Sequence, residues 1–272
     1  MKTQFLARER NFVAYDDIGG AGTPVICVPG LGDLRQEYRY LGPILQYAGY
    51  RVITMDLRGH GESGVDWSDY SPEAVGSDIL ALIEHLNLKK AIIVGTSFAA
   101  ASAVWAAGVA PDLILGLVLC GPFIRDVPLI FVQRVMMQVL FSGPWKVAAW
   151  VAYYASLYPS KKPTDFEQYQ RKLKINLSEP GRFNALSAMM FGKKAACEQQ
   201  ASNVQAPSLT IMGTKDPDFQ EPETEAKFVA RQLTGKYIMI EGVGHYPHVE
   251  QAENVGSQVL KFIHKITQTN KV

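Results

Sequence analysis

Gly95-Thr96-Ser97-Phe98-Ala99 is the stretch in which a buried strand should end, turn at a serine and restart as a helix. The apolar run 91–94 precedes it, and the small-residue run 99–103 follows it. A sharp strand–serine–helix turn lifts the hydroxyl off the edge of a sheet towards a substrate. The turn needs small residues beside the serine, because larger side chains would strike the strand or the helix. Gly95 meets this need fully and Ala99 approximately, so we predict that Ser97 is a nucleophile.

An acid and a histidine follow Ser97 at suitable places in the chain. Asp216 comes just after the expected strand 208–212, and His245 comes just after the expected strand 236–240. The order serine, aspartate, histidine is that of the α/β-hydrolase fold, not of the chymotrypsin or subtilisin folds. Asp126 remains an alternative acid, because it follows the expected strand that ends near residue 119. Asp218 lies behind a proline and is expected in a solvated loop.

Three further segments support a family resemblance. Residues 24–33 look like the oxyanion-hole strand and loop of the α/β-hydrolase superfamily, with Pro29-Gly30 where members often carry His-Gly. Residues 55–63 look like the loop after the following strand, and 244–250 look like the histidine loop. The chain therefore resembles this superfamily over nearly its whole length. The resemblance implies that the backbone N–H groups of Leu31 and Phe98 form the oxyanion hole.

The pattern along the chain predicts an α/β fold with a doubly wound, mostly parallel sheet. Short, continuous apolar runs suit parallel strands that are covered on both faces, and helical patterns alternate with them. Expected strands are 12–16, 25–28, 50–55, 91–94, 113–119, 208–212 and 236–240, and expected helices are 34–47, 72–86, 98–110, 223–233 and 252–266.

Residues 123–201 interrupt the alternation with a helical pattern, and they look like the helical cap that many α/β-hydrolases insert here. We therefore expect a core domain made of residues 1–122 and 202–272, with the cap inserted between them. Most large apolar side chains of the cap should pack it onto the core. One face could instead line an apolar pocket, with Met136, Trp145, Trp150, Tyr153 and Met189 as candidate substrate-binding residues. Peripheral membrane contact is the third interpretation, although no uninterrupted apolar span of about 20 residues exists.

Composition excludes several classes of partner. The chain has 27 basic and 26 acidic side chains, so no strong field favours nucleic acid. The charged segment 1–10 does not read as a secretory signal, and we expect no integral membrane span. Three cysteines without framework spacing suggest reduced thiols and a cytoplasmic location. We expect no cofactor and no metal, because the sequence shows no phosphate loop, dinucleotide fingerprint or metal-ligand cluster.

The function that these features favour is a serine hydrolase that cleaves an ester, lactone or thioester of a mainly apolar small molecule. Carbon–carbon bond hydrolysis, cofactor-free perhydrolysis and acyl transfer use the same triad and stay open. A small-molecule (lactone) receptor with slow turnover is an alternative of another class, and any protein partner is unknown. Epoxide hydrolases and haloalkane dehalogenases of this fold use an aspartate nucleophile, whereas this chain has Ser97.

Overall fold

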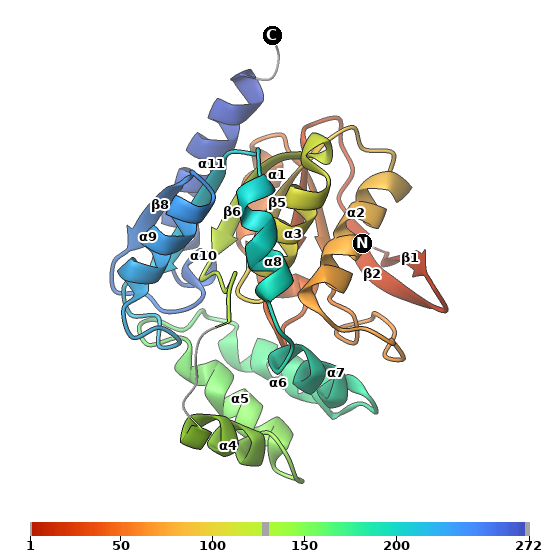
Figure 1. Ribbon diagram of the computed structural model, residues 1–272, viewed down its shortest axis with the longest axis vertical. Helices are drawn as coiled ribbons and strands as arrows, with labels where there is room; N and C mark the ends of the chain where they lie inside the picture. The colour runs from red at the N-terminus through yellow and green to blue at the C-terminus, as the bar shows by residue number, and fades with distance from the viewer. Residues whose placement is uncertain (1, 127–130, 270–272) are drawn as a thin grey trace.

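The computed structural model describes residues 2–126 and 131–269, and an eight-stranded sheet forms its centre (Figure 1). The strand order is β1-β2-β4-β3-β5-β6-β7-β8. β1 and β2 are antiparallel to their neighbours, whereas β4, β3, β5, β6, β7 and β8 run parallel to one another. The mostly parallel α/β fold is thus confirmed. The strands are β1 (Gln4–Arg8), β2 (Asn11–Asp17), β3 (Pro24–Val28), β4 (Arg51–Met55), β5 (Ala91–Thr96), β6 (Ile114–Cys120), β7 (Ser208–Gly213) and β8 (Lys236–Ile240).

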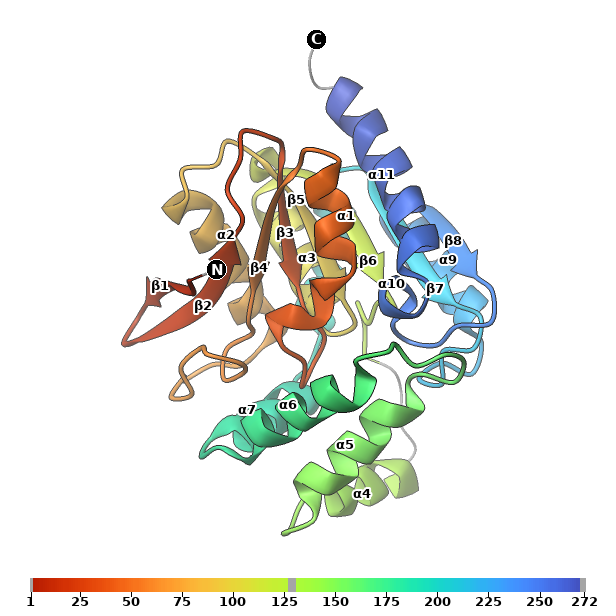
Figure 2. The same cartoon turned by 180° about the vertical axis from the view of Figure 1, so that it is seen from behind.

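Helices cover both faces of the sheet. In Figure 1, α2 (Pro72–His85), α3 (Ala99–Val109), α8 (Ala195–Gln200) and α9 (Pro222–Gln232) lie on the near face. Figure 2 shows α1 (Leu41–Tyr47) and α11 (Ala252–Thr269) on the other face. Short helical turns complete the core at η1 (Arg35–Arg39), η2 (Pro111–Leu113), η3 (Ala201–Asn203) and α10 (Pro247–Glu250).

The sequence of β5 explains why helices pack on both of its faces. All six of its residues are buried, and successive side chains point to opposite faces of the sheet. Ala91 and Ile93 join the apolar cluster beneath α2 and α3. Ile92 and Val94 join the cluster beneath α1 and α11. Both faces of the strand are therefore apolar. This explains why its sequence is a continuous run of apolar residues and does not alternate apolar with polar residues.

A helical region is inserted between β6 and β7. Its helices α4 (Phe131–Leu140), α5 (Lys146–Ser156), α6 (Phe166–Ser178) and α7 (Arg182–Met190) lie across the carboxyl ends of the parallel strands (Figure 1). We call these four helices and their connections the cap. The last inserted helix, α8, instead lies beside α3 in the core (Figure 1). The exact domain boundaries at 123 and 201 stay a prediction.

Two local features differ from the expectation. The charged start of the chain contains β1, in which only Leu6 is buried, so this strand was not expected from the sequence. The expected helix 34–47 is instead the 3-10 turn η1, which has non-helical backbone angles at Tyr38, followed by the short helix α1. Among the described residues, no helix is both long and apolar enough to cross a membrane.

Candidate active site

Ser97 occupies a strained turn between β5 and α3. Its φ angle is +55°, a left-handed conformation that costs free energy in a residue other than glycine. The turn also explains Gly95, because a Cβ atom there would lie 2.9 Å from the carbonyl oxygen of Ala99. The N–H of Ser97 donates to the carbonyl of Cys120 at 2.9 Å, which fixes the turn against the end of β6. The local structure predicted for the nucleophile is therefore present.

The loop after β3, residues 29–34, runs beside this turn, and we call it the oxyanion loop after its predicted role. A Cβ atom on Gly30 would lie 3.3 Å from the Cβ of Ser97, so the two segments are in close approach. The N–H of Gly30 donates to Oε2 of Glu37 at 2.8 Å, which orients the loop. Within residues 2–126 and 131–269, the N–H groups of Leu31 and Phe98 have no hydrogen-bond acceptor. Their role as an oxyanion hole stays a prediction.

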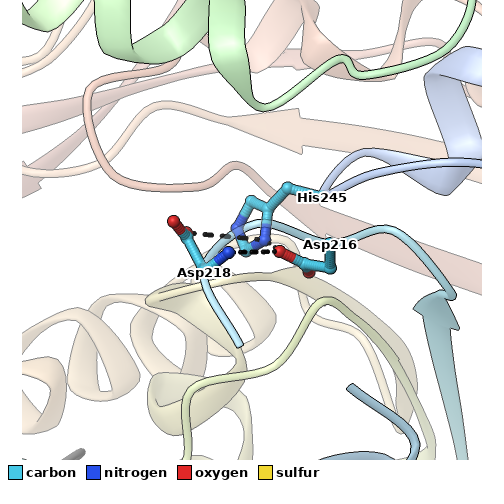
Figure 3. A group of neighbouring side chains, drawn as sticks. All are labelled: Asp216, Asp218 and His245. Atoms are coloured by element: carbon cyan, nitrogen blue, oxygen red, sulfur yellow. Dashed lines mark hydrogen bonds and ion pairs between the residues drawn. The ribbon is translucent and has the colours of Figure 1, made fainter. Parts of the chain in front are cut away.

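His245 pairs with Asp216 at the carboxyl edge of the sheet (Figure 3). Its Nδ1 lies 2.8 Å from Oδ2 of Asp216, and both side chains are almost fully buried. Burial lowers the pKa of His245, but the facing carboxylates of Asp216 and Asp218 outweigh it and raise the pKa to about 9. Because this hydrogen bond occupies Nδ1, Nε2 is the ring nitrogen that can accept a proton from another group.

Ser97 and His245 flank the segment that follows β6. Ser97 bonds to Cys120, and its carbonyl accepts the N–H of Phe123 at 3.2 Å. A Cβ atom on Gly121 would lie 3.0 Å from two atoms of the His245 ring. Among the described residues, no hydrogen bond joins Ser97 Oγ to the ring, whose Nδ1 bonds to Asp216. Such bonds are often long or misaligned before substrate binds, so the Ser97–His245 contact stays a prediction.

Asp218 does not lie in a solvated loop, so that expectation was wrong. Its side chain is 13% exposed, and its Oδ2 lies 3.7 Å from Nδ1 of His245. It is covered because the hydroxyl of Tyr153, on α5 of the cap, donates to its Oδ1 at 2.6 Å. Ligand atoms of Asp216, Asp218 and His245 lie within 4.8 Å of one another, a spacing that a cation could bridge. We assign the group to hydrogen bonding, since Nδ1 is already engaged with Asp216.

The alternative acid, Asp126, is placed elsewhere. Its Oδ1 accepts the backbone N–H of Lys194, the residue that precedes α8. The structure therefore brings Asp216, and not Asp126, to His245.

A buried polar pair beside the site was missed in the sequence. Glu37 and His248 are fully buried and are joined by a 2.8 Å contact between Oε1 and Nε2. His248 lies in α10, and its partner Glu37 also accepts the N–H of Gly30 in the loop after β3. A glutamate within an expected amphipathic helix gives no sign of burial, because its partner is 211 positions away.

Polar contacts from several elements hold the cap against the carboxyl edge of the sheet. The guanidinium of Arg39 makes two hydrogen bonds to the carboxylate of Asp165, at 2.6 and 2.9 Å. The hydroxyl of Tyr169 on α6 donates to Asp33 in the oxyanion loop. The N–H of His245 donates to the carbonyl of Leu157 at 3.0 Å. The last of these contacts reaches His245 itself, which is only 1% exposed.

The five cap residues considered for substrate binding are placed differently. Trp150 is buried and lies over the oxyanion loop, because a Cβ atom on Gly32 would come within 2.5 Å of its indole ring. Met189 is fully buried in the cluster that contains Phe98. Tyr153 is half-buried and contacts Trp150, with ring centroids 5.3 Å apart. Met136 and Trp145 are 60% and 52% exposed, so we leave them out of the proposed pocket.

Comparisons with known proteins agree with this architecture. The family model described as alpha/beta hydrolase fold matches residues 23–252. BpoC of Mycobacterium tuberculosis, named as a candidate non-heme bromoperoxidase, is 30% identical over 92% of this chain and 97% of its own. A dihydrolipoyllysine-residue acetyltransferase component of an acetoin cleaving system from Pseudomonas putida is 25% identical, and the match covers 92% of this chain and 66% of that protein.

Solved structures show the same fold. An esterase from Exiguobacterium antarcticum superimposes with a TM-score of 0.84 at 19% identity, covering 97% of this chain and all of the other. A bromoperoxidase from Bacillus anthracis gives a TM-score of 0.83 at 21% identity, again over 97% of this chain and all of the other. The match of one family model to most of the sequence shows that the chain belongs to the alpha/beta hydrolase fold family.

Proposed function

We propose that this protein is a serine hydrolase that cleaves an ester, lactone or thioester of a mainly apolar small molecule. The observation that carries the proposal is the 2.8 Å pair of His245 and Asp216 at the same sheet edge as the strained Ser97 turn. Serine is a weak nucleophile until a neighbouring base takes its proton. The buried pair supplies such a base, together with an acid that offsets the charge that the base acquires.

In the proposed reaction, Ser97 Oγ attacks the acyl carbon and its proton passes to Nε2 of His245. Asp216 stabilises the resulting imidazolium, while the N–H groups of Leu31 and Phe98 bind the oxyanion. Collapse of the tetrahedral intermediate breaks the bond to the alcohol or thiol, which leaves with the proton from His245. Water then attacks the acyl-enzyme by the same steps and releases the acid.

The apolar substrate class follows from the walls near Ser97. Leu31 packs against both the core cluster that holds Phe98 and Met189 and the cap cluster that holds Trp150. The apolar surface is therefore continuous from the nucleophile turn to the cap. Nε1 of Trp150 is buried and has no hydrogen-bond partner among the described residues. We propose that it donates a hydrogen bond to a polar atom of the substrate.

The test combines labelling with a substrate screen. A fluorophosphonate should label Ser97 and abolish turnover of p-nitrophenyl esters, and Ser97→Ala should remove both the labelling and the turnover. A screen of acyl chain lengths and lactones should favour apolar acyl groups. Failure of the intact protein to react with the probe and with every ester would contradict the proposal.

Perhydrolysis is the second candidate, because BpoC and the protein from Bacillus anthracis are named as bromoperoxidases, and a peroxidase uses the peroxide that perhydrolysis needs. Peroxide would then replace water as the attacking group on the acyl-enzyme. Peracid formation from acetate and hydrogen peroxide at a rate above that of ester hydrolysis would favour it. A lactone receptor would instead release product slowly after a burst.

Cellular location also stays a proposal. Cys27, Cys120 and Cys197 are unpaired and buried, which fits the reducing cytoplasm.

A further inference from the structure

A second carboxylate, that of Asp218, faces His245 beside Asp216 (Figure 3). We propose that Tyr153 and Asp218 are a positioning pair through which the seated cap tunes the basicity of His245. The phenol of Tyr153 holds the Asp218 side chain, and that carboxylate faces Nδ1 of the imidazole. The inference rests on the proposed function, because it treats His245 as the base of the reaction.

Asp218 is fixed at both its backbone and its side chain. Its N–H donates to Oδ1 of Asp216 at 3.0 Å, so the two acids share one turn. Its carboxylate accepts the Tyr153 hydroxyl at 2.6 Å. The next residue, Phe219, stacks on Phe123 with ring centroids 4.5 Å apart, which anchors the far side of the turn. The carboxylate therefore cannot turn away from His245 without breaking a bond to the cap.

Other groups also face His245. Asp216 belongs to the same turn as Asp218, and the buried Glu37 on η1 adds a weaker attraction for the imidazolium. The ring of Tyr246 lies edge-on at 5.2 Å, and Ser97 is on the nucleophile turn. None of these partners is held by a hydrogen bond to α5 within the described residues. The cap also holds the backbone of His245, because the N–H of this residue donates to the carbonyl of Leu157 at the end of α5. The Tyr153–Asp218 bond is thus the side-chain route by which the placement of α5 reaches the imidazole.

The pair should have opposite effects on the rate at low and high pH. A second negative charge near Nδ1 stabilises the imidazolium that forms when Ser97 loses its proton, so it makes His245 a stronger base. The same charge keeps more of the ring protonated, and hence unreactive, near neutral pH. Burial raises the pKa of Asp218, and the hydrogen bond from Tyr153 opposes that rise and favours its charged form.

The experiment compares Asp218→Asn and Tyr153→Phe with the unaltered protein. The readouts are the pH profile of kcat/KM and the pH titration of the His245 imidazole nitrogen chemical shifts. Asp218→Asn should lower both midpoints by about one to two pH units, the range expected for loss of a nearby opposite charge. Tyr153→Phe should shift both in the same direction by less. Asp218→Asn should be faster than the parent at acidic pH and slower on the alkaline plateau.

Tyr40→Phe is the matched control, because its hydroxyl donates to the cap-side carboxylate of Asp165 at 2.8 Å, and neither residue is among the groups that shift the pKa of His245. It should leave both midpoints unchanged. Unshifted midpoints in Asp218→Asn and Tyr153→Phe, or an equal shift in Tyr40→Phe, would overturn the inference. The titration of His245 also separates this failure from failure of the proposed function, which would appear as full turnover by Ser97→Ala.

Discussion

Glu37 links the oxyanion loop to the last part of the chain: its Oε1 lies 2.8 Å from Nε2 of His248, and its Oε2 accepts the N–H of Gly30 at 2.8 Å. Both side chains are completely buried. Replacement of Glu37 by leucine would fill the same space with an apolar side chain but remove both acceptor oxygens. Glu37→Leu should destabilise the fold by about 1–3 kcal/mol, the cost of unpaired buried polar groups, as measured by urea unfolding.

The same variant should lose at least about tenfold in kcat, because one misplaced oxyanion donor costs more than that in other hydrolases. Glu37→Gln is the matched control, since an amide can accept from Gly30 and donate to His248. It should keep most of the stability and activity. Parental kcat in folded Glu37→Leu would show that this link does not orient the loop.

The conformation of Ser97 should limit stability. At a φ of +55°, alanine is as strained as serine, whereas glycine is not. We expect Ser97→Gly to be more stable than Ser97→Ala by about 1 kcal/mol, measured by chemical unfolding of both inactive variants. Equal stabilities would mean that the turn carries no strain.

Gly32 allows the indole of Trp150 to rest on the oxyanion loop. Gly32→Ala would place a Cβ atom 2.5 Å from that ring, at a φ of +72°. The ring must move, so kcat/KM for apolar esters should fall by about tenfold or more, since small misplacements at a site are costly.

Gly19→Ala is the control for backbone strain alone. Gly19 has a φ of +76°, and a Cβ atom there would meet no atom within 4 Å. This variant should lose about 1 kcal/mol of stability with unchanged kcat/KM. Equal activities of the two alanine variants would refute a role for the Gly32–Trp150 contact.

Activity and stability should depend on pH in opposite ways. His245 must be neutral to take a proton, and its pKa is raised to about 9, so kcat/KM should rise through that pH. The folded value exceeds the unfolded value of about 6.5, so the stabilising effect is complete below about pH 6.5. It is lost as the pH rises towards 9. His245→Asn should show a flatter stability profile between these limits.

The parts of the site that depend on local sequence were predictable, and those that depend on distant packing were not. The Ser97 turn is visible because a strand, small residues and a helix adjoin it in the chain. The expected strands around β5 to β8 were found because both faces of the sheet select apolar residues. The Glu37–His248 pair joins distant segments, and Asp218 is covered by a cap residue 65 positions away, so no local pattern marks them.

The most direct measurement of the central claim is peptide mapping after reaction with a fluorophosphonate, done in parallel with the turnover of a p-nitrophenyl ester. The account predicts one equivalent of label on Ser97, loss of turnover in proportion to labelling, and neither labelling nor turnover in Ser97→Ala. Undiminished turnover by Ser97→Ala, or a stoichiometric label on another residue, would contradict it.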